Sequence, residues 1–147
     1  MKQAVVLAPC KVNLTLDITR RRSDGYHEME MILLAADLCD RVTVTLHSGR
    51  GIRVECDDQM VPLDEGNLAV RAARIFYQRT GLPAQGTDIA IEKRIPMEAG
   101  LAGGSADAAA VLVALNALCG TGLPLEELEA MALPLGADVP FCLRGGV

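Results

Sequence analysis

The chain lacks tryptophan and has only two phenylalanines and two tyrosines among its 147 residues. Half of its residues are nevertheless hydrophobic, so the sequence predicts a single domain with an aliphatic core. A domain of this length buries roughly 70% of the surface of its unfolded chain. Basic residues are also few, since 14 Lys and Arg stand against 19 Asp and Glu. The net charge of −5 argues against nucleic-acid binding as the main function.

Signals for disulfides, metal clusters and membranes are missing as well. The five cysteines are odd in number and widely scattered, with no C-x-x-C pair and no histidine cluster nearby. This pattern is typical of reduced thiols in a cytosol rather than of a disulfide framework or a zinc site. The N-terminus leads into a strand-like run rather than a signal peptide, and no apolar run approaches membrane-spanning length. The sequence therefore predicts a cytoplasmic protein.

The most informative segment that is present is the glycine-rich stretch at 96–109. Gly100, Gly103 and Gly104 run into Ser105 and an alanine-rich segment that favours a helix. Glycines let the backbone approach an anion, and the N-terminus of a helix offers unpaired N–H groups and partial positive charge. The stretch is therefore predicted to bind phosphate, although a purely structural turn is the alternative. Neither the P-loop nor the dinucleotide fingerprint matches its spacing.

Hydrophobic periodicity predicts strands in the first half and helices in the second. Alternation favours strands at 12–18, 42–46, 52–56 and 88–95, and a continuous apolar run lies at 29–36. Ser48 to Gly51 reads as a hairpin turn. Helical spacing occurs at 67–79, 105–118 and 125–133, with Gly81 and Pro134 as stop signals. This order predicts an α+β fold, in which helices pack on one face of a mixed sheet.

The strand at 12–18 carries the first polar pair of interest. If Val12, Leu14 and Leu16 face the core, Lys11 and Asn13 share the opposite, open face. An amine beside an amide suits an anionic ligand. A solvated lysine at a sheet edge is the alternative.

Two turns carry further polar groups. The Asp-Gly turn at 24–25 leads into Tyr26 and His27, which could recognise a nucleobase or only cover the rim of the core. Asp138 lies in a loop, where the following Val-Pro pair is expected to keep Val139 extended and so fix the carboxylate. A turn or capping aspartate is the alternative.

These segments together resemble the superfamily of galactokinase, homoserine kinase, mevalonate kinase and phosphomevalonate kinase. Four motifs occur in the family order, namely Ala-Pro-x-Lys-x-Asn-Leu at 8–14, Asp-Gly-Tyr-His-Glu at 24–28, the glycine-rich loop at 96–109 and Gly-Ala-Asp-Val-Pro-Phe at 136–141. The second motif is similar to that of the members that phosphorylate a cytidine diphosphate-linked methylerythritol on the non-mevalonate route to isoprenoids. It disfavours a homoserine or mevalonate kinase, which is the runner-up.

The resemblance implies an ATP- and Mg²⁺-dependent small-molecule kinase with a fold like that of ribosomal protein S5 domain 2. It implies that Asp138 accepts or orients the substrate proton and that Lys11 stabilises the transferring phosphoryl group. It also implies that Asn13, Tyr26 and His27 bind the substrate. The implied nucleotide-binding residues are Pro96, Gly100, Leu101, Ala102, Gly103, Gly104, Ser105, Asn67 and Lys93, and Ser105 is in addition the implied Mg²⁺ contact.

Three residues near the loop raise questions. Ala102 replaces a family glycine, and its methyl group is expected to be tolerated only if φ is negative there. Ala106 replaces a family serine and removes one hydroxyl. Asp107, expected in the first turn of the helix, would repel phosphate unless Mg²⁺ lies between them, and interaction with the helix dipole is the alternative.

Members of the superfamily are nearly twice as long as this chain. Residues 1–147 are therefore expected to form the N-terminal, ATP-binding domain, without the C-terminal domain that closes the substrate cleft. Such a half is expected to bind nucleotide weakly and to phosphorylate little or not at all, and it could form a homodimer through its exposed interface. A non-catalytic nucleotide-binding fragment is an alternative, as is an RNA-binding module, which the acidic charge disfavours.

Overall fold

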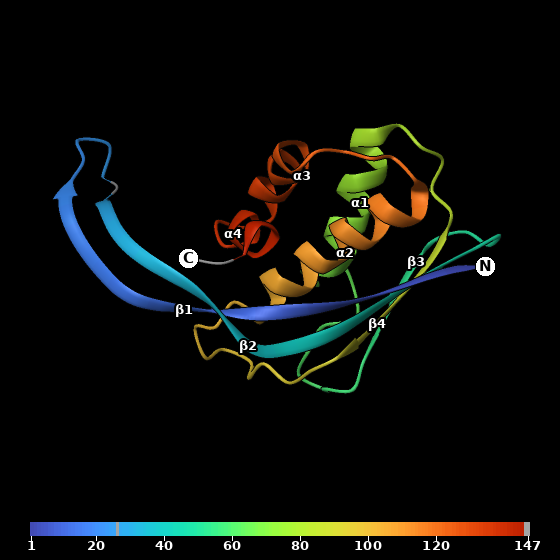
Figure 1. Ribbon diagram of the computed structural model, residues 1–147, viewed down its shortest axis with the longest axis horizontal. Coiled ribbons are helices and arrows are strands. Elements are labelled where there is room, and N and C mark those ends of the chain that lie inside the picture. The colour runs from blue at the N-terminus through green and yellow to red at the C-terminus, as the bar shows by residue number, and fades with distance from the viewer. Residues whose placement is uncertain (26, 146–147) are drawn as a thin grey trace.

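The computed structural model describes residues 1–25 and 27–145, without the side chains at 16–17 and 27–30. One sheet carries the helices on one of its faces (Figure 1). The elements in chain order are β1 (Lys2–Arg21), β2 (His27–His47), β3 (Ile52–Cys56), α1 (Leu68–Thr80), β4 (Gly86–Glu92), α2 (Gly103–Cys119), α3 (Leu125–Ala132), the 3-10 turn η1 (Leu133–Leu135) and α4 (Val139–Arg144). The predicted α+β class is confirmed. Within the described residues, no helix is both long and apolar enough to span a membrane.

The sheet has the strand order β1-β2-β4-β3. β2 pairs antiparallel with β1 and with β4, whereas β3 runs parallel to β4, so the sheet is mixed as predicted. The hairpin predicted at 48–51 is wrong, because β4 lies between β2 and β3. The Gly86 N–H, at the start of β4, donates to the Gly49 carbonyl (2.8 Å). The chain passes from β3 to β4 through α1, because two parallel strands need a crossover connection.

The core lies between the sheet and the helices that cover it. Alternate residues of β2 and β4 face the helices, and α2 contributes small side chains that allow close packing. Fully buried members are Val42, Val44, Ala72, Phe76, Ile89, Ala108, Leu112 and Leu115. The helix predicted at 67–79 is confirmed as α1, which buries Ala72 and Phe76 in this core. Its predicted stop is confirmed too, since Gly81 ends the helix with φ of +68°, a conformation that glycine adopts without strain.

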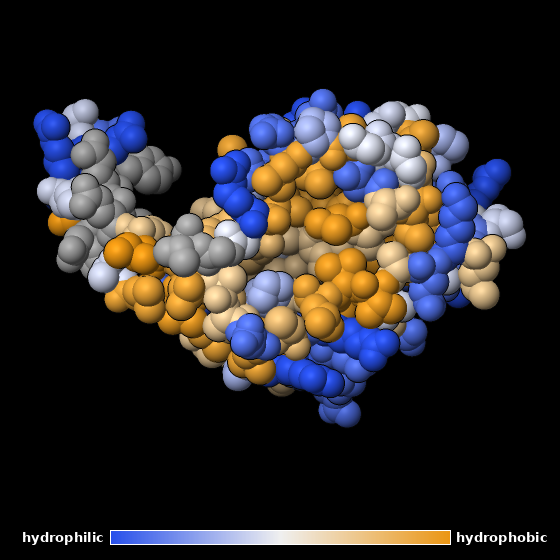
Figure 2. Space-filling view, in the orientation of Figure 1, coloured by the Kyte–Doolittle hydropathy of each residue, from blue (hydrophilic) through white to orange (hydrophobic). Residues whose placement is uncertain are grey.

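β1 and β2 continue past the helices as a two-stranded ribbon (Figure 1). The predicted strand at 12–18 and the apolar run at 29–36 pair with each other in this ribbon, for example Asn13 with Leu33. The prediction that Leu14 faces the core is wrong, because none of the described helices covers this part of the sheet (Figure 1) and Leu14 is 56% exposed. Figure 2 shows hydrophobic side chains at the surface where the ribbon leaves the helical body.

Two leucines offer a test of where the core lies. Leu112 in α2 is 0% exposed, whereas Leu133 in η1 is 66% exposed. Leu112→Ala should lower the free energy of unfolding by roughly 2–5 kcal/mol, because it leaves a cavity between α2 and the sheet. Leu133→Ala should change it by less than about 0.5 kcal/mol. Urea unfolding followed by circular dichroism measures both, and similar losses in the two variants would contradict this packing.

Candidate functional site

The glycine-rich segment forms an open loop at 96–105 that leads into α2. The loop and Leu68 line a shallow cavity of about 250 Å³. The backbone takes the left-handed conformation three times in five residues, with φ of +57° at Glu98, +72° at Gly100 and +57° at Ala102. The condition expected for Ala102, a negative φ, is therefore not met. Ala102 is the N-cap residue of α2, which begins at Gly103, two residues before the predicted start.

β1 holds this loop from one side through Lys11. The Lys11 N–H donates to the Leu101 carbonyl (3.0 Å). Its Nζ donates to Asn13 Oδ1 (3.1 Å), so the two side chains meet as the strand period predicted. The expectation of an open face is wrong for Lys11, whose side chain is only 9% exposed. The Nζ atom lies 3.5 Å from Asp138 Oδ2, so the structure brings Lys11, Asn13, Asp138 and the loop together.

Asp138 reaches Lys11 from the N-cap position of α4. Its side chain makes no capping hydrogen bond, which leaves the carboxylate free to face the lysine. The extended conformation predicted for Val139 is wrong, because Val139 begins α4 and donates its N–H to the Gly136 carbonyl (3.2 Å). Pro140 is tolerated beside it, since the first turn of a helix needs no N–H there. A methyl group on Gly136 would lie 4.0 Å from Ser105 Oγ, so this motif packs beside the start of α2.

A buried ion group, formed by the side chains of Asp40, Lys93 and Asp107, lies beneath the loop. Lys93 Nζ donates to Asp40 Oδ2 and to Asp107 Oδ2 (3.1 Å), and none of the three side chains is more than 4% exposed. Burial raises the pKa of Asp107 to about 7, although the charge of Lys93 opposes this shift. Burial lowers the pKa of Lys93, but the hydrogen bond to Asp40 and the charge of Asp107 outweigh it, and the net shift is upward. The predicted place of Asp107 in the first turn of α2 is wrong, and its carboxylate is paired with Lys93 instead.

A second cavity of about 210 Å³ adjoins the loop. Its lining residues are Val61, Pro62, Gly66, Asn67, Leu68, Lys93, Met97, Gly104 and Asp107, of which Leu68, Met97 and Gly104 also line the first cavity. Asn67 is the N-cap residue of α1, where it accepts from the Ala69 N–H (2.9 Å) and donates to the Pro62 carbonyl (2.8 Å). Both Asn67 and Lys93 therefore stabilise the fold, and their contact with a nucleotide stays a prediction.

Two predicted substrate residues cannot be placed in the site. Tyr26 and the side chain of His27 lie outside the described residues. The turn at 24–25 that precedes them is at the far end of the β1–β2 ribbon. The substrate contacts of Tyr26 and His27 stay predictions.

Sequence reasoning missed Asp40. The signal was present, because Asp40 continues the buried phase of Val42, Val44 and Leu46 along β2 and is itself 0% exposed. A charged residue in a core-facing phase of a strand requires a buried partner. That partner is Lys93.

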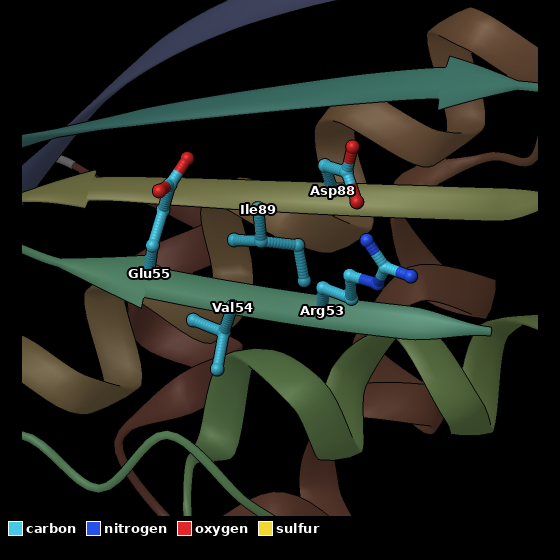
Figure 3. A pocket seen from close by; sticks show the side chains of 5 residues that line it. All are labelled: Arg53, Val54, Glu55, Asp88 and Ile89. Atoms are coloured by element: carbon cyan, nitrogen blue, oxygen red, sulfur yellow. The ribbon is translucent and has the colours of Figure 1, made fainter.

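A further cavity, of about 260 Å³, lies at β3 and β4 (Figure 3). Arg53 extends toward Asp88 on the neighbouring strand, and Asp88 Oδ2 lies 3.4 Å from His47 Nε2. The residues that line this cavity are Arg53, Val54, Glu55, Asp88 and Ile89. None of the predicted site residues is among them. The candidate site is therefore the glycine-rich loop together with Lys11 and Asp138.

Comparison with known proteins gives the following similarities. The family described as "GHMP kinases N terminal domain" matches residues 67–146. The 4-diphosphocytidyl-2-C-methyl-D-erythritol kinase of Geobacter metallireducens is 50% identical over 145 residues, which are 99% of this chain and 51% of that protein. A crystal structure of 4-(cytidine 5'-diphospho)-2C-methyl-D-erythritol kinase matches with a TM-score of 0.82 and 44% identity, over 96% of this chain and 49% of that one.

More distant similarity is limited to the fold. A homoserine kinase from Cytophaga hutchinsonii has a TM-score of 0.71 at 23% identity, over 99% of this chain and 43% of that one. The chain spans about half the length of the relatives that it matches.

The raised pKa of Asp107 gives stability a pH dependence. The pKa is about 7 in the folded protein against an ordinary value of 3.8. Between about pH 4 and about pH 7 the folded state binds more protons than the unfolded state, so the free energy of unfolding should fall as pH rises. Urea unfolding across this range should give a flatter profile for Asp107→Asn. Asp37→Asn, at an exposed position of β2, is the matched control. The prediction fails if Asp107→Asn keeps the wild-type slope.

The left-handed conformation of Ala102 gives a second test. An alanine there is strained by about 1–2 kcal/mol, and the freedom of glycine in the unfolded chain offsets roughly 0.4–1 kcal/mol of the relief. Ala102→Gly should therefore raise the free energy of unfolding by about 0.5–1 kcal/mol. Ala106→Gly, inside α2, should lower it by about 1 kcal/mol. Thermal or urea unfolding compares the two, and destabilisation by both would show that Ala102 is not left-handed.

Proposed function

The chain belongs to the GHMP kinase family, and from this premise we propose that it supplies the ATP-binding and catalytic half of a small-molecule kinase. The reaction is the ATP-dependent phosphorylation of the 2-hydroxyl group of 4-diphosphocytidyl-2-C-methyl-D-erythritol, on the non-mevalonate route to isoprenoid precursors. The observation that carries the proposal is that Lys11 contacts the glycine loop through its N–H and Asp138 through its amine. Residues 1–147 act as the N-terminal domain, and the rest of the substrate cleft comes from a C-terminal domain.

The choice of substrate is supported by the similarity to proteins that are named 4-diphosphocytidyl-2-C-methyl-D-erythritol kinase. Identity is 50% to the Geobacter metallireducens protein but only 23% to the homoserine kinase, which supports no more than a shared fold. A homoserine or mevalonate kinase is the alternative among enzymes, and a non-catalytic nucleotide-binding fragment is the alternative outside them. The proposal includes a cytoplasmic location, which agrees with five cysteines that are all free.

The loop at 96–105 binds the ATP phosphates in this proposal. The first N–H groups of α2 have no acceptor within the helix and carry partial positive charge, so they attract a phosphate oxygen. Gly104 leaves this position open, because a methyl group there would meet only Leu68 at 3.8 Å. The adjoining cavity, with Asn67 and Lys93 in its wall, receives the adenine.

Lys11 and Asp138 carry the chemistry at the substrate hydroxyl. Asp138 is 37% exposed, so a hydroxyl group can reach its carboxylate, which accepts or orients the proton. The Lys11 ammonium, held by Asn13 and largely buried, stabilises the charge of the transferring phosphoryl group. Asn13, which is hydrogen-bonded to Lys11, also contacts the substrate in this proposal. Tyr26 and His27 recognise the cytosine.

Mg²⁺ is the proposed cofactor beside ATP. The described residues contain no group of three or more His, Cys, Asp or Glu that could hold a metal ion. Mg²⁺ in a kinase is held by one or two protein oxygens together with phosphates and water. The Ser105 hydroxyl in the first turn of α2 suits this role. The ion, when bound, neutralises charge on the phosphates.

A hybrid enzyme tests this proposal. Residues 1–147 would replace the matching half of the Geobacter metallireducens kinase, and a coupled assay would follow ADP release with the cytidyl substrate. Turnover is expected, and Lys11→Met and Asp138→Asn should each lower kcat at least about 100-fold. Glu55→Gln, at an exposed position of β3, is the control that should keep full activity.

The same assay separates the alternatives. Turnover with homoserine or mevalonate instead of the cytidyl substrate would identify the runner-up enzyme. Full turnover in Asp138→Asn would remove Asp138 from the chemistry. Residues 1–147 alone should release ADP far more slowly than the hybrid, and equal rates would show that no second domain is required.

A further inference from the structure

One buried carboxylate holds the backbone that leads into the glycine loop. Asp40 Oδ1 accepts from the Arg94 N–H (2.5 Å) and from the Ile95 N–H (2.8 Å). These two residues directly precede Pro96, where the loop begins. Since Asp40 lies in β2 and is 0% exposed, it fixes the start of the loop to the sheet.

The same carboxylate reaches the other end of the loop through Lys93. Its Oδ2 accepts from Lys93 Nζ, which also donates to Asp107 Oδ2 (3.1 Å) in α2. The backbone N–H of Lys93 donates to Asp57 Oδ1 (2.7 Å), so the lysine is fixed from a second direction. Asp40 thereby links both ends of the loop.

The end of the loop rests on Lys93 itself. A methyl group on Gly103 would lie 2.9 Å from Lys93 Nζ and 3.1 Å from Ile95 Cγ2. The first residue of α2 therefore packs against the ion group with no room for a side chain. Any shift of the Lys93 amine would move this part of the loop.

The conformation of the loop needs such an external hold. Glu98 and Ala102 both have φ of +57°, which is strained for residues with a side chain. Strained residues persist only where the surrounding structure over-determines them. Asp40 and Lys11 supply the two connections to the sheet, one at the start of the loop and one at Leu101.

We propose that Asp40 is a positioning residue for nucleotide phosphates, because it holds the glycine loop in its phosphate-binding conformation without touching the ligand. The inference rests on the ATP site of the proposed function. The competing account is that the ion group only stabilises the fold. In that case, loss of Asp40 would weaken the binding of every ligand equally through a smaller folded fraction, whereas positioning predicts a selective loss at the phosphates.

The test compares ADP with adenosine on the whole chain of residues 1–147. In Asp40→Asn the amide oxygen can still accept from Arg94 and Ile95, but the amide group cannot accept from Lys93. NMR titration should show ADP bound about tenfold more weakly and adenosine changed by less than about twofold. Asp37→Asn, the same change at an exposed position of β2, should leave both affinities as in the wild type.

The outcomes separate the two proposals. Equal weakening of ADP and adenosine in Asp40→Asn, or an unchanged ADP affinity, overturns the positioning role while the ATP site stands. A wild-type chain that binds no ADP overturns the ATP site and the positioning role together.

A second variant covers the case in which Asp40→Asn does not fold. Asp107→Leu has a similar shape and keeps the pair of Asp40 and Lys93, but it cuts the link to α2. It should weaken ADP about threefold more than adenosine, whose own affinity can change because Asp107 also lines the proposed adenine cavity. An unchanged ratio of the two affinities would show that Lys93 does not hold the end of the loop, and would overturn the inference.

Discussion

The buried ion group of Asp40, Lys93 and Asp107 is the interaction on which the candidate site depends. Burying charge is unfavourable unless the charges are paired and hydrogen-bonded. Two carboxylates share one ammonium here, and Asp107 Oδ1 has no partner among the described residues, which agrees with the raised pKa of Asp107. Apolar side chains of similar size are often as stabilising as such a group. Its presence is better explained by what it positions than by what it adds to stability.

Lys11 couples the glycine loop to Asp138. Its N–H binds the Leu101 carbonyl and its amine lies 3.5 Å from Asp138, so one residue of β1 sets both positions. Asp138 comes from the start of α4, and Gly136 just before it packs near Ser105 at the start of α2. A displacement of β1 would therefore move the glycine loop and the carboxylate together. In the proposed function, this fixes the phosphate-binding loop and the Asp138 carboxylate relative to each other.

The sequence was sufficient for local features and insufficient for spatial neighbours. α1, its stop at Gly81 and the α+β class were predicted correctly, because periodicity and stop signals are local. Alternation shows which face a residue occupies but not which strand lies beside it, so the 48–51 hairpin was wrong. Leu14 was misplaced since alternation presumes a covering layer, which the ribbon lacks. Asp40 shows the converse. Its position in the alternation along β2 predicts that it is buried, but alternation does not show that its partner is Lys93, which lies 53 residues away.

Ala102 shows how strain and positioning fit together. A glycine would adopt φ of +57° without strain, but it would also let an unanchored loop take many other conformations. Alanine restricts those alternatives, provided that the rest of the structure holds the strained one. Asp40 at the start of the loop and Lys11 at Leu101 do so through hydrogen bonds to the backbone. The sheet therefore fixes the conformation of the loop, so that in the proposed function the binding of a nucleotide need not order it.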